Sequence, residues 1–183
     1  MPQPAWQFDP AHSSIAFTVR HMMVTKVRGE FTNWSGTLDL DPDQPERSSV
    51  SVDIDAATID TRVADRDTHL RSADFLDVAN FPRITFRSTK VERTAPDALA
   101  IHGDLTIRGV TRPVVLAAEM NGPVKDAWGG VRAGFSARTA IERRDYGLLW
   151  NVALEAGGFL VGDRVEIALE IEAVQPAAAA VAA

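Results

Sequence analysis

The sequence contains no cysteine, and this absence excludes disulfide bonds, thiolate metal sites and cysteine nucleophiles. It also lacks an apolar run long enough to cross a bilayer, so we expect a protein that does not span a membrane. Its first residues, MPQPAWQFDPAHSS, show no basic segment followed by an apolar one. No signal peptide is therefore visible, and the expected location is cytoplasmic.

A surplus of positive charge is missing as well. Lysine and arginine number 19 against 25 acidic residues, which gives a net charge of −6. Because no basic stripe alternates with aromatic residues either, we expect no nucleic-acid partner. With 45% hydrophobic residues among 183, the chain can build the core of a single domain. We place that domain at residues 1–174, followed by a disordered alanine-rich tail over residues 175–183.

The dominant pattern in the sequence has a period of two. Its clearest case is the segment around Val165, Ile167 and Leu169, whose apolar residues alternate with glutamate or alanine. Such alternation is typical of antiparallel strands with one buried and one solvated face. Eight segments show it, near residues 13–21, 29–40, 48–57, 83–92, 98–108, 113–121, 130–141 and 163–174.

Eight antiparallel strands must hide two sheet edges, and closure into a barrel does so. The interior of such a barrel is filled by side chains or holds one small ligand, and here the inward faces are apolar. A two-sheet sandwich would show the same alternation. Two segments break the period, residues 61–76 and 146–160.

The first of these segments, TRVADRDTHLRSADFL, predicts a short helix with Thr61 or Asp60 as its N-cap. On a helix, Val63, Arg66, Asp67 and Leu70 share one face, so Arg66 and Asp67 point toward the protein.

Three interpretations of this face remain open. An arginine–carboxylate network locks the helix onto the barrel, or Arg66 binds the head group of a ligand because arginine suits phosphate geometry. Alternatively, Asp67 and His69 form a catalytic acid–base pair.

Motifs for metal binding and catalysis are absent from the sequence. The four histidines form no metal-binding pair, and no nucleophile elbow, P-loop or dinucleotide fingerprint occurs. We therefore expect no metal, no cofactor and no catalytic residue. His21 continues the apolar parity of its strand, which predicts that it points inward near one end of the barrel.

Four ordered fragments carry a resemblance to a known family: WQFDPAHSSIAFTVRHMMVTKVRGEF, DTRVADRDTHLRSADFLDVANFPRITFRST, IHGDLTIRGVTRPV and IERRDYGL. Together, from about Trp6 to Val174, they resemble the YceI-like family of lipid-binding proteins. The resemblance implies an extended eight-stranded antiparallel lipocalin-like barrel with a short helical cap. It implies a hydrophobic tunnel for a polyisoprenoid or another long-chain amphiphile, and a homodimer. Many members are periplasmic, whereas the absence of a visible leader in this sequence makes the cytoplasmic members the expected comparison.

The last fragment includes the family's R-x-D-aromatic-Gly turn, formed here by Arg143, Asp145, Tyr146 and Gly147. Asp145 is a candidate partner for an arginine, and Gly147 allows a sharp turn of the chain. Arg143 or Tyr146 are alternatives for contacting a head group.

From these observations we predict a barrel that sequesters or transports a long-chain isoprenoid or similar lipid. The predicted lipid-binding residues comprise a cavity wall, three head-group candidates and two aromatic residues at the tunnel mouth. They are Phe17, Val19, Trp34, Leu38, Ile54, Phe86, Leu105 and Phe135; His21, Arg66 and Arg143; and Trp150 and Phe159. Two alternatives stay open: an enzyme that uses Asp67 and His69, or Asp145, on a bound lipid, and a structural or stress protein with a filled core.

Overall fold

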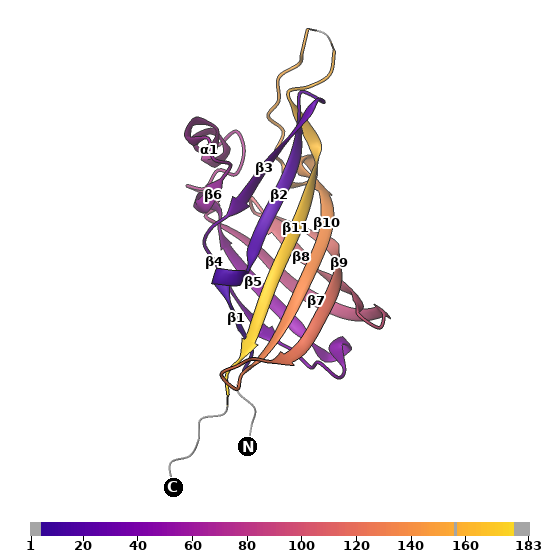
Figure 1. Ribbon diagram of the computed structural model, residues 1–183. Coiled ribbons are helices and arrows are strands. Elements are labelled where there is room, and N and C mark those ends of the chain that lie inside the picture. The colour runs from indigo at the N-terminus through magenta and orange to yellow at the C-terminus, as the bar shows by residue number, and fades with distance from the viewer. Residues whose placement is uncertain (1–4, 156, 178–183) are drawn as a thin grey trace.

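A computed structural model describes residues 5–155 and 157–177, and its architecture is one strongly curled antiparallel sheet (Figure 1). The described residues form eleven strands. These are β1 (Gln7–Phe8), β2 (Ser14–His21), β3 (Thr25–Phe31), β4 (Trp34–Asp39), β5 (Ser49–Asp55), β6 (Ile59–Asp60), β7 (Arg83–Ala95), β8 (Ala98–Ile107), β9 (Val110–Lys125), β10 (Val131–Glu142) and β11 (Val161–Gln175).

The order of strands in the sheet is β4-β5-β7-β8-β9-β10-β11-β2-β3-β6, with antiparallel neighbours throughout. The short strand β1 links the sheet back on itself. Gln7 pairs with Val174 of β11, while Trp6 forms a bridge to Leu38 of β4. The all-β, lipocalin-like barrel predicted from the sequence is thus confirmed, although the described residues form eleven strands and the sequence predicted eight.

The strand count differs because the predicted strand over residues 29–40 is two strands, β3 and β4. Between them the chain turns, and the turn is held by a distant segment: Thr32 N–H donates to Thr58 O (3.3 Å) and Asn33 N–H donates to Thr58 Oγ1 (3.2 Å). Thr58 ends the short 3₁₀ helix η3 (Ala56–Thr58), which also leads into β6. The two-residue strands β1 and β6 are too short to produce a periodic signal.

Alternation along the strands follows the predicted parity. In β11, Val165, Ile167 and Leu169 face the interior, whereas Glu166 and Glu170 are exposed. The predicted tail begins inside this strand, since β11 runs to Gln175. Residues 178–183 of that tail lie outside the described residues.

The segment over residues 61–76 contains the predicted helix, α1 (Ala64–Arg71). Its N-cap is Val63, without a side-chain hydrogen bond, so the prediction of Thr61 or Asp60 as N-cap is wrong. Thr61 is instead held by Asp67, whose carboxylate accepts its N–H. Val63 is 47% exposed and does not share the buried face.

Figure 1 shows how the segments outside the sheet are arranged. Helix α1 lies beside β3 and β6, and the long connection between β10 and β11 projects at the end of the barrel away from the two termini. That connection begins with the 3₁₀ helix η4 (Arg143–Tyr146). Two further 3₁₀ helices, η1 (Pro10–His12) and η2 (Pro45–Arg47), flank β2 and β5.

The core consists of apolar side chains on the inner face of the sheet. Ile84, Phe86 and Leu105, on β7 and β8, are at most 8% exposed. Trp6 and Pro45 are buried as well, near β1 and before β5. Across the described part of the chain, no helix has both the length and the apolar character needed to traverse a bilayer.

Candidate functional site

The interior of the curled sheet holds a cavity of about 420 Å³. This volume falls within the range of about 300–1,000 Å³ that is usual for small-molecule sites. Every strand contributes at least one lining residue, including Phe8 from β1 and Ile59 from β6, and helix α1 adds Arg66, His69 and Leu70. The cavity is therefore a product of the whole fold.

All eight residues predicted for the cavity wall line this cavity. They are Phe17, Val19, Trp34, Leu38, Ile54, Phe86, Leu105 and Phe135. Ile54, Phe86 and Leu105 are buried, whereas Phe17 and Val19 stay half-buried because they border open space. Their contact with a lipid stays a prediction.

The two predicted mouth aromatics have different positions. Trp150 lines the cavity, and its ring centroid lies 4.6 Å from that of His69 and 5.3 Å from that of Phe75. Phe159 is 52% exposed and is not among the lining residues. An isolated bridge between Ala153 and Phe159 folds this part of the connection back on itself, which places Phe159 away from the cavity.

Arg143 lines the cavity, but its guanidinium is occupied by the protein. Its Nη1 donates to the carbonyl oxygens of Leu148 (2.6 Å) and Trp150 (2.9 Å), and its Nε donates to Gly162 O (3.0 Å). Its Nη2 lies 2.9 Å from Asp163 Oδ1. The side chain is 4% exposed, and burial lowers the Arg143 pKa while the Asp163 carboxylate opposes that shift. Arg143 thus fastens the connection between β10 and β11 to the barrel.

The remainder of the R-x-D-aromatic-Gly turn supports this anchor. Gly147 has a φ of +75°, a left-handed conformation that favours glycine, so the predicted sharp turn is confirmed. Asp145 is exposed, and its backbone carbonyl accepts a hydrogen bond from Arg112 Nε (3.2 Å). The described residues show no ion pair for the Asp145 carboxylate, because Asp163 takes the role predicted for it. Tyr146 is buried and does not line the cavity.

Arg66 also lines the cavity, and its contacts are of another kind. Its Nε donates to Thr61 Oγ1 (2.7 Å) and its Nη2 donates to Thr61 O (2.8 Å). Thr61 in turn donates its N–H (2.9 Å) and its hydroxyl (2.5 Å) to Asp67 Oδ1. Arg66 and Asp67 are therefore linked only through Thr61, and the two charged groups make no direct contact in the described structure.

Asp67 and His69 do not form the acid–base pair that one interpretation of the sequence predicted. His69 Nε2 lies 2.8 Å from Asp74 Oδ2, whereas Asp67 is 6% exposed and bonds to Thr61. His21, at the end of β2, lines the cavity as its parity predicted. Asp67 and His69 thus have separate partners.

Most of the lining residues are not among those predicted from the sequence, and two cases show which signals the sequence offers. Val27 and Phe31 of β3 line the cavity, and the alternation through Gly29 was a usable signal for a strand that starts before residue 29. Phe75 lines the cavity after the end of α1. No local periodicity marks Phe75, since it lies in an irregular turn.

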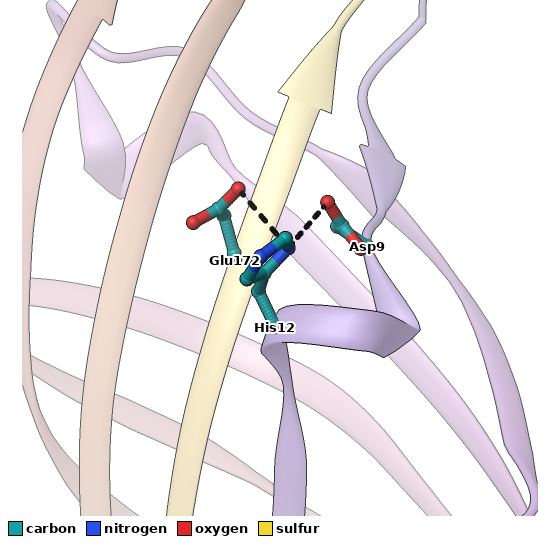
Figure 2. Close-up of side chains that lie close together, drawn as sticks. All are labelled: Asp9, His12 and Glu172. Atoms are coloured by element: carbon teal, nitrogen blue, oxygen red, sulfur yellow. Dashed lines mark hydrogen bonds and ion pairs between the residues drawn. The ribbon is translucent and has the colours of Figure 1, made fainter.

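A cluster of possible metal ligands lies outside the cavity, near the termini (Figure 2). His12 Nδ1 lies 3.0 Å from Asp9 Oδ2 and 4.0 Å from Glu172 Oε1. Arg132 pairs with both carboxylates and with Asp126. The hydrogen bond with His12, followed by that with Arg132, lowers the pKa of Asp9. These ion pairs join η1 to β10 and β11.

Comparison with known proteins agrees with this geometry. A family model described as the YceI-like domain matches residues 6–173. Protein YceI of Salmonella newport (strain SL254) is 40% identical over 164 residues, which cover 90% of this chain and 82% of the relative.

Solved structures show the same fold. The crystal structure of the Campylobacter jejuni YCEI protein has a TM-score of 0.73 and 29% identity, and the match covers 85% of this chain and 88% of that one. A polyisoprenoid binding domain from Saccharophagus degradans has a TM-score of 0.70 at 14% identity, with 94% and 99% covered. The latter likeness concerns the fold alone. Since the family model spans nearly the whole described chain, this protein belongs to the YceI-like family.

Proposed function

We propose that this protein binds a long-chain amphiphilic lipid of the polyisoprenoid class inside the barrel, in order to sequester or transport it. The observation that carries the proposal is the 420 Å³ cavity, whose wall consists mostly of apolar side chains from every strand. A structural neighbour named as a polyisoprenoid binding domain supports the class of ligand.

Hydrophobic transfer alone supplies enough free energy for such binding. Burial of one methylene group contributes about 0.8 kcal/mol, so ten buried groups contribute on the order of 8 kcal/mol before association costs. The lining needs only shape and apolar character for this purpose, and polar groups then orient the head group.

Each alternative function meets an obstacle in the structure. A structural protein with a filled core does not explain an apolar cavity of this size. An enzyme acting through Asp67 and His69 lacks their mutual contact, and Asp145 lies outside the cavity lining. A binding role fits the arrangement best.

The direct test is mass spectrometry of an organic extract from the purified protein, with a denatured and refolded sample as control. We expect a stoichiometric long-chain isoprenoid that is absent after refolding and is recovered when a polyprenol is added. A fatty acid or amide in its place would contradict the isoprenoid class while keeping the carrier. Failure of the folded protein to bind any of these lipids would contradict the proposal itself.

A matched pair of variants on β11 locates the ligand. Val165 lines the cavity, whereas Ala168 on the same strand is exposed. Val165→Trp places a large ring in the space for the ligand and is expected to abolish lipid recovery, while Ala168→Trp retains it. Equal lipid content in the two variants would place the lipid elsewhere.

The proposal extends to assembly and location, as a homodimer in the cytoplasm. Light scattering coupled to size-exclusion chromatography measures the first, and fractionation of the native host measures the second. A monomeric mass, or recovery outside the cytoplasm, would contradict the respective part and leave lipid binding untouched.

A further inference from the structure

The charge of the cavity lining differs in sign from that of the protein. The chain carries a net charge of −6. Among the residues that the structure describes, the cavity wall nevertheless includes no carboxylate side chain. Its ionisable members are all basic: Arg20, His21, Arg66, His69 and Arg143. A wall of this composition favours an anionic or hydrogen-bond-accepting ligand group.

Most of these basic side chains have a carboxylate nearby. Arg143 lies 2.9 Å from Asp163, and His69 lies 2.8 Å from Asp74. Arg20 is exposed, at an outward position of β2, and its charge acts on Glu166 of the adjacent strand β11. These three are therefore committed to the protein or to the solvated face.

Arg66 is the arginine of the lining that retains binding capacity. Both of its acceptors are neutral oxygens of Thr61. In the described part of the chain, no carboxylate oxygen lies within 4.0 Å of its guanidinium, and its Nη1 donates no hydrogen bond. A guanidinium has five N–H donors, so at least the two on Nη1 remain available.

Hydrogen bonds that run from Asp67 through Thr61 hold the Arg66 guanidinium in place for such a role. The buried carboxylate of Asp67 fixes both the N–H and the hydroxyl of Thr61. Thr61 Oγ1, having donated its proton to Asp67, then accepts from Arg66 Nε. This chain of bonds orients the guanidinium without neutralising it by direct contact, which preserves its attraction for an external anion.

We propose that Arg66 binds the oxyanion head group of the lipid, with Thr61 and Asp67 as positioning residues. The inference rests on the proposed lipid-binding function and specifies its ligand class: an amphiphile whose head is a carboxylate or a phosphate. Such a head accepts two parallel hydrogen bonds from the guanidinium, in a partly desolvated setting where charge-assisted bonds are strong. A neutral alcohol, amide or quinone offers no compensating charge.

A purely structural role for Arg66 makes a different prediction. If the side chain only joined α1 to Thr61, its loss would weaken the binding of every lipid equally, by loosening the helix. A head-group role weakens only the anionic ligands. The test must therefore compare ligands that share a tail and differ in the head.

The experiment measures dissociation constants by displacement of a fluorescent apolar probe from the delipidated, refolded full chain. The ligands are farnesyl phosphate against farnesol, and palmitate against hexadecanol. The variants are Arg66→Gln and Arg66→Lys. Arg62→Gln is the control, since Arg62 is an exposed neighbour of like charge outside the cavity lining.

We expect the native chain to prefer at least one anion over its alcohol. Arg66→Gln should weaken the binding of that anion about 10- to 100-fold, the effect of losing a charge-assisted hydrogen bond. It should leave alcohol binding within about twofold, and Arg66→Lys should retain part of the preference because it keeps the charge. Arg62→Gln should change neither ligand.

The two anions distinguish the source of the head group: preference for farnesyl phosphate identifies a phosphate, and preference for palmitate a carboxylate. Equal weakening of anion and alcohol in Arg66→Gln, with an unchanged unfolding midpoint, would overturn the inference, as would a native chain without any anion preference. If Arg66→Gln lowers the unfolding midpoint, Arg66→Lys decides the outcome through the same ratio of anion affinity to alcohol affinity. Failure of all ligands in all variants would instead overturn the proposed function.

Discussion

Two segments outside the sheet, residues 61–76 and 143–160, each place an arginine in the wall of one cavity. They use it differently. In the second segment, Arg143 donates to four backbone carbonyl oxygens and pairs with Asp163, so its guanidinium is saturated. In the first, Arg66 bonds only to the neutral oxygens of Thr61.

The difference shows that residue type and location are insufficient to assign a binding role. Both side chains are arginines that line the cavity. What separates them is the number of acceptors that the fold already supplies. A saturated arginine stabilises a loop, whereas one with free donors is available to a ligand.

The largest expected effect concerns the saturated arginine. Arg143→Met leaves several carbonyl oxygens without a donor and removes the buried one of the two arginines that pair with Asp163, so we expect it to lower the free energy of unfolding by about 3–5 kcal/mol. Denaturant titration measures this loss, and hydrogen exchange should show faster exchange over residues 148–161.

Arg144 supplies the matched control for that variant. It also pairs with Asp163, through Nε at 3.0 Å, but is exposed. Arg144→Met is expected to cost less than about 1 kcal/mol, as is usual for surface ion pairs. Equal losses in the two variants would show that burial of Arg143 contributes nothing, and the contrast drawn between the two segments would fail.

The next largest loss of stability is expected from removal of the Asp67 carboxylate, which supports the segment over residues 61–76. Asp67 is 6% exposed and accepts two hydrogen bonds from Thr61. Asp67→Ala is expected to cost about 2–3 kcal/mol of stability, because it strips a charged acceptor from buried donors. Thermal or denaturant unfolding measures the change.

Asp65, an exposed residue on the same helix, is the control for Asp67. Asp65→Ala should change stability by less than about 0.5 kcal/mol. A similar small effect for Asp67→Ala would mean that Thr61 and Arg66 keep their positions without the carboxylate, which would remove the positioning role assigned to Asp67.

A smaller loss of stability is expected at low pH, and it arises in the ionic cluster near the termini, outside the two segments that line the cavity. The pKa of Asp9 is lowered by hydrogen bonds with His12 and Arg132. A lowered folded-state pKa gives stability that is fully present above the unfolded value of about 3.9 and is lost as the pH falls through the folded value.

Asp9→Asn keeps the side-chain oxygen that caps η1 and removes the charge. We expect this variant to be less stable than the native chain at pH 7, and the difference to shrink below about pH 4. A difference that is constant from pH 7 to pH 3 would show that the charge of Asp9 is not involved.

The sequence predicted those parts of the fold that depend on a local period. Side chains alternate along any strand, so the parity of Phe17, Val165 and Ile167 was sufficient to point them inward. The break between β3 and β4 was missed, because Thr58, far along the chain, holds it. An interaction at such separation leaves no periodic trace.

The same limit applies to the candidate site. The helical face carrying Arg66 and Asp67 was predictable from the spacing of residues three and four apart. The acceptors of Arg143 were not, since they are backbone carbonyls that any residue carries. Phe159 was misplaced for a related reason: whether a loop residue points inward depends on how the loop folds back, here through the bridge to Ala153.

The smallest expected change in stability comes from Tyr146, which lies in the same segment as Arg143. Tyr146 is 1% exposed, and its hydroxyl has no hydrogen-bond partner among the described residues. Burial raises the pKa of Tyr146 to about 12. A buried hydroxyl without a partner costs free energy, so Tyr146→Phe is expected to be neutral or to stabilise the fold by about 1 kcal/mol.

Because the sequence has a single tyrosine, ultraviolet titration of the phenolate reports this residue alone. Absorbance at the phenolate band should stay flat through pH 10 and rise near pH 12 or on unfolding. A raised folded-state pKa means stability that is complete below the unfolded value of about 10 and is lost as the pH climbs through the folded one. Tyr146→Phe should abolish that alkaline loss. A clear destabilisation by Tyr146→Phe, together with titration of the phenol near pH 10, would show that the hydroxyl is solvated or hydrogen-bonded. The segment that Arg143 holds would then be less tightly packed around Tyr146 than the buried position of that residue indicates.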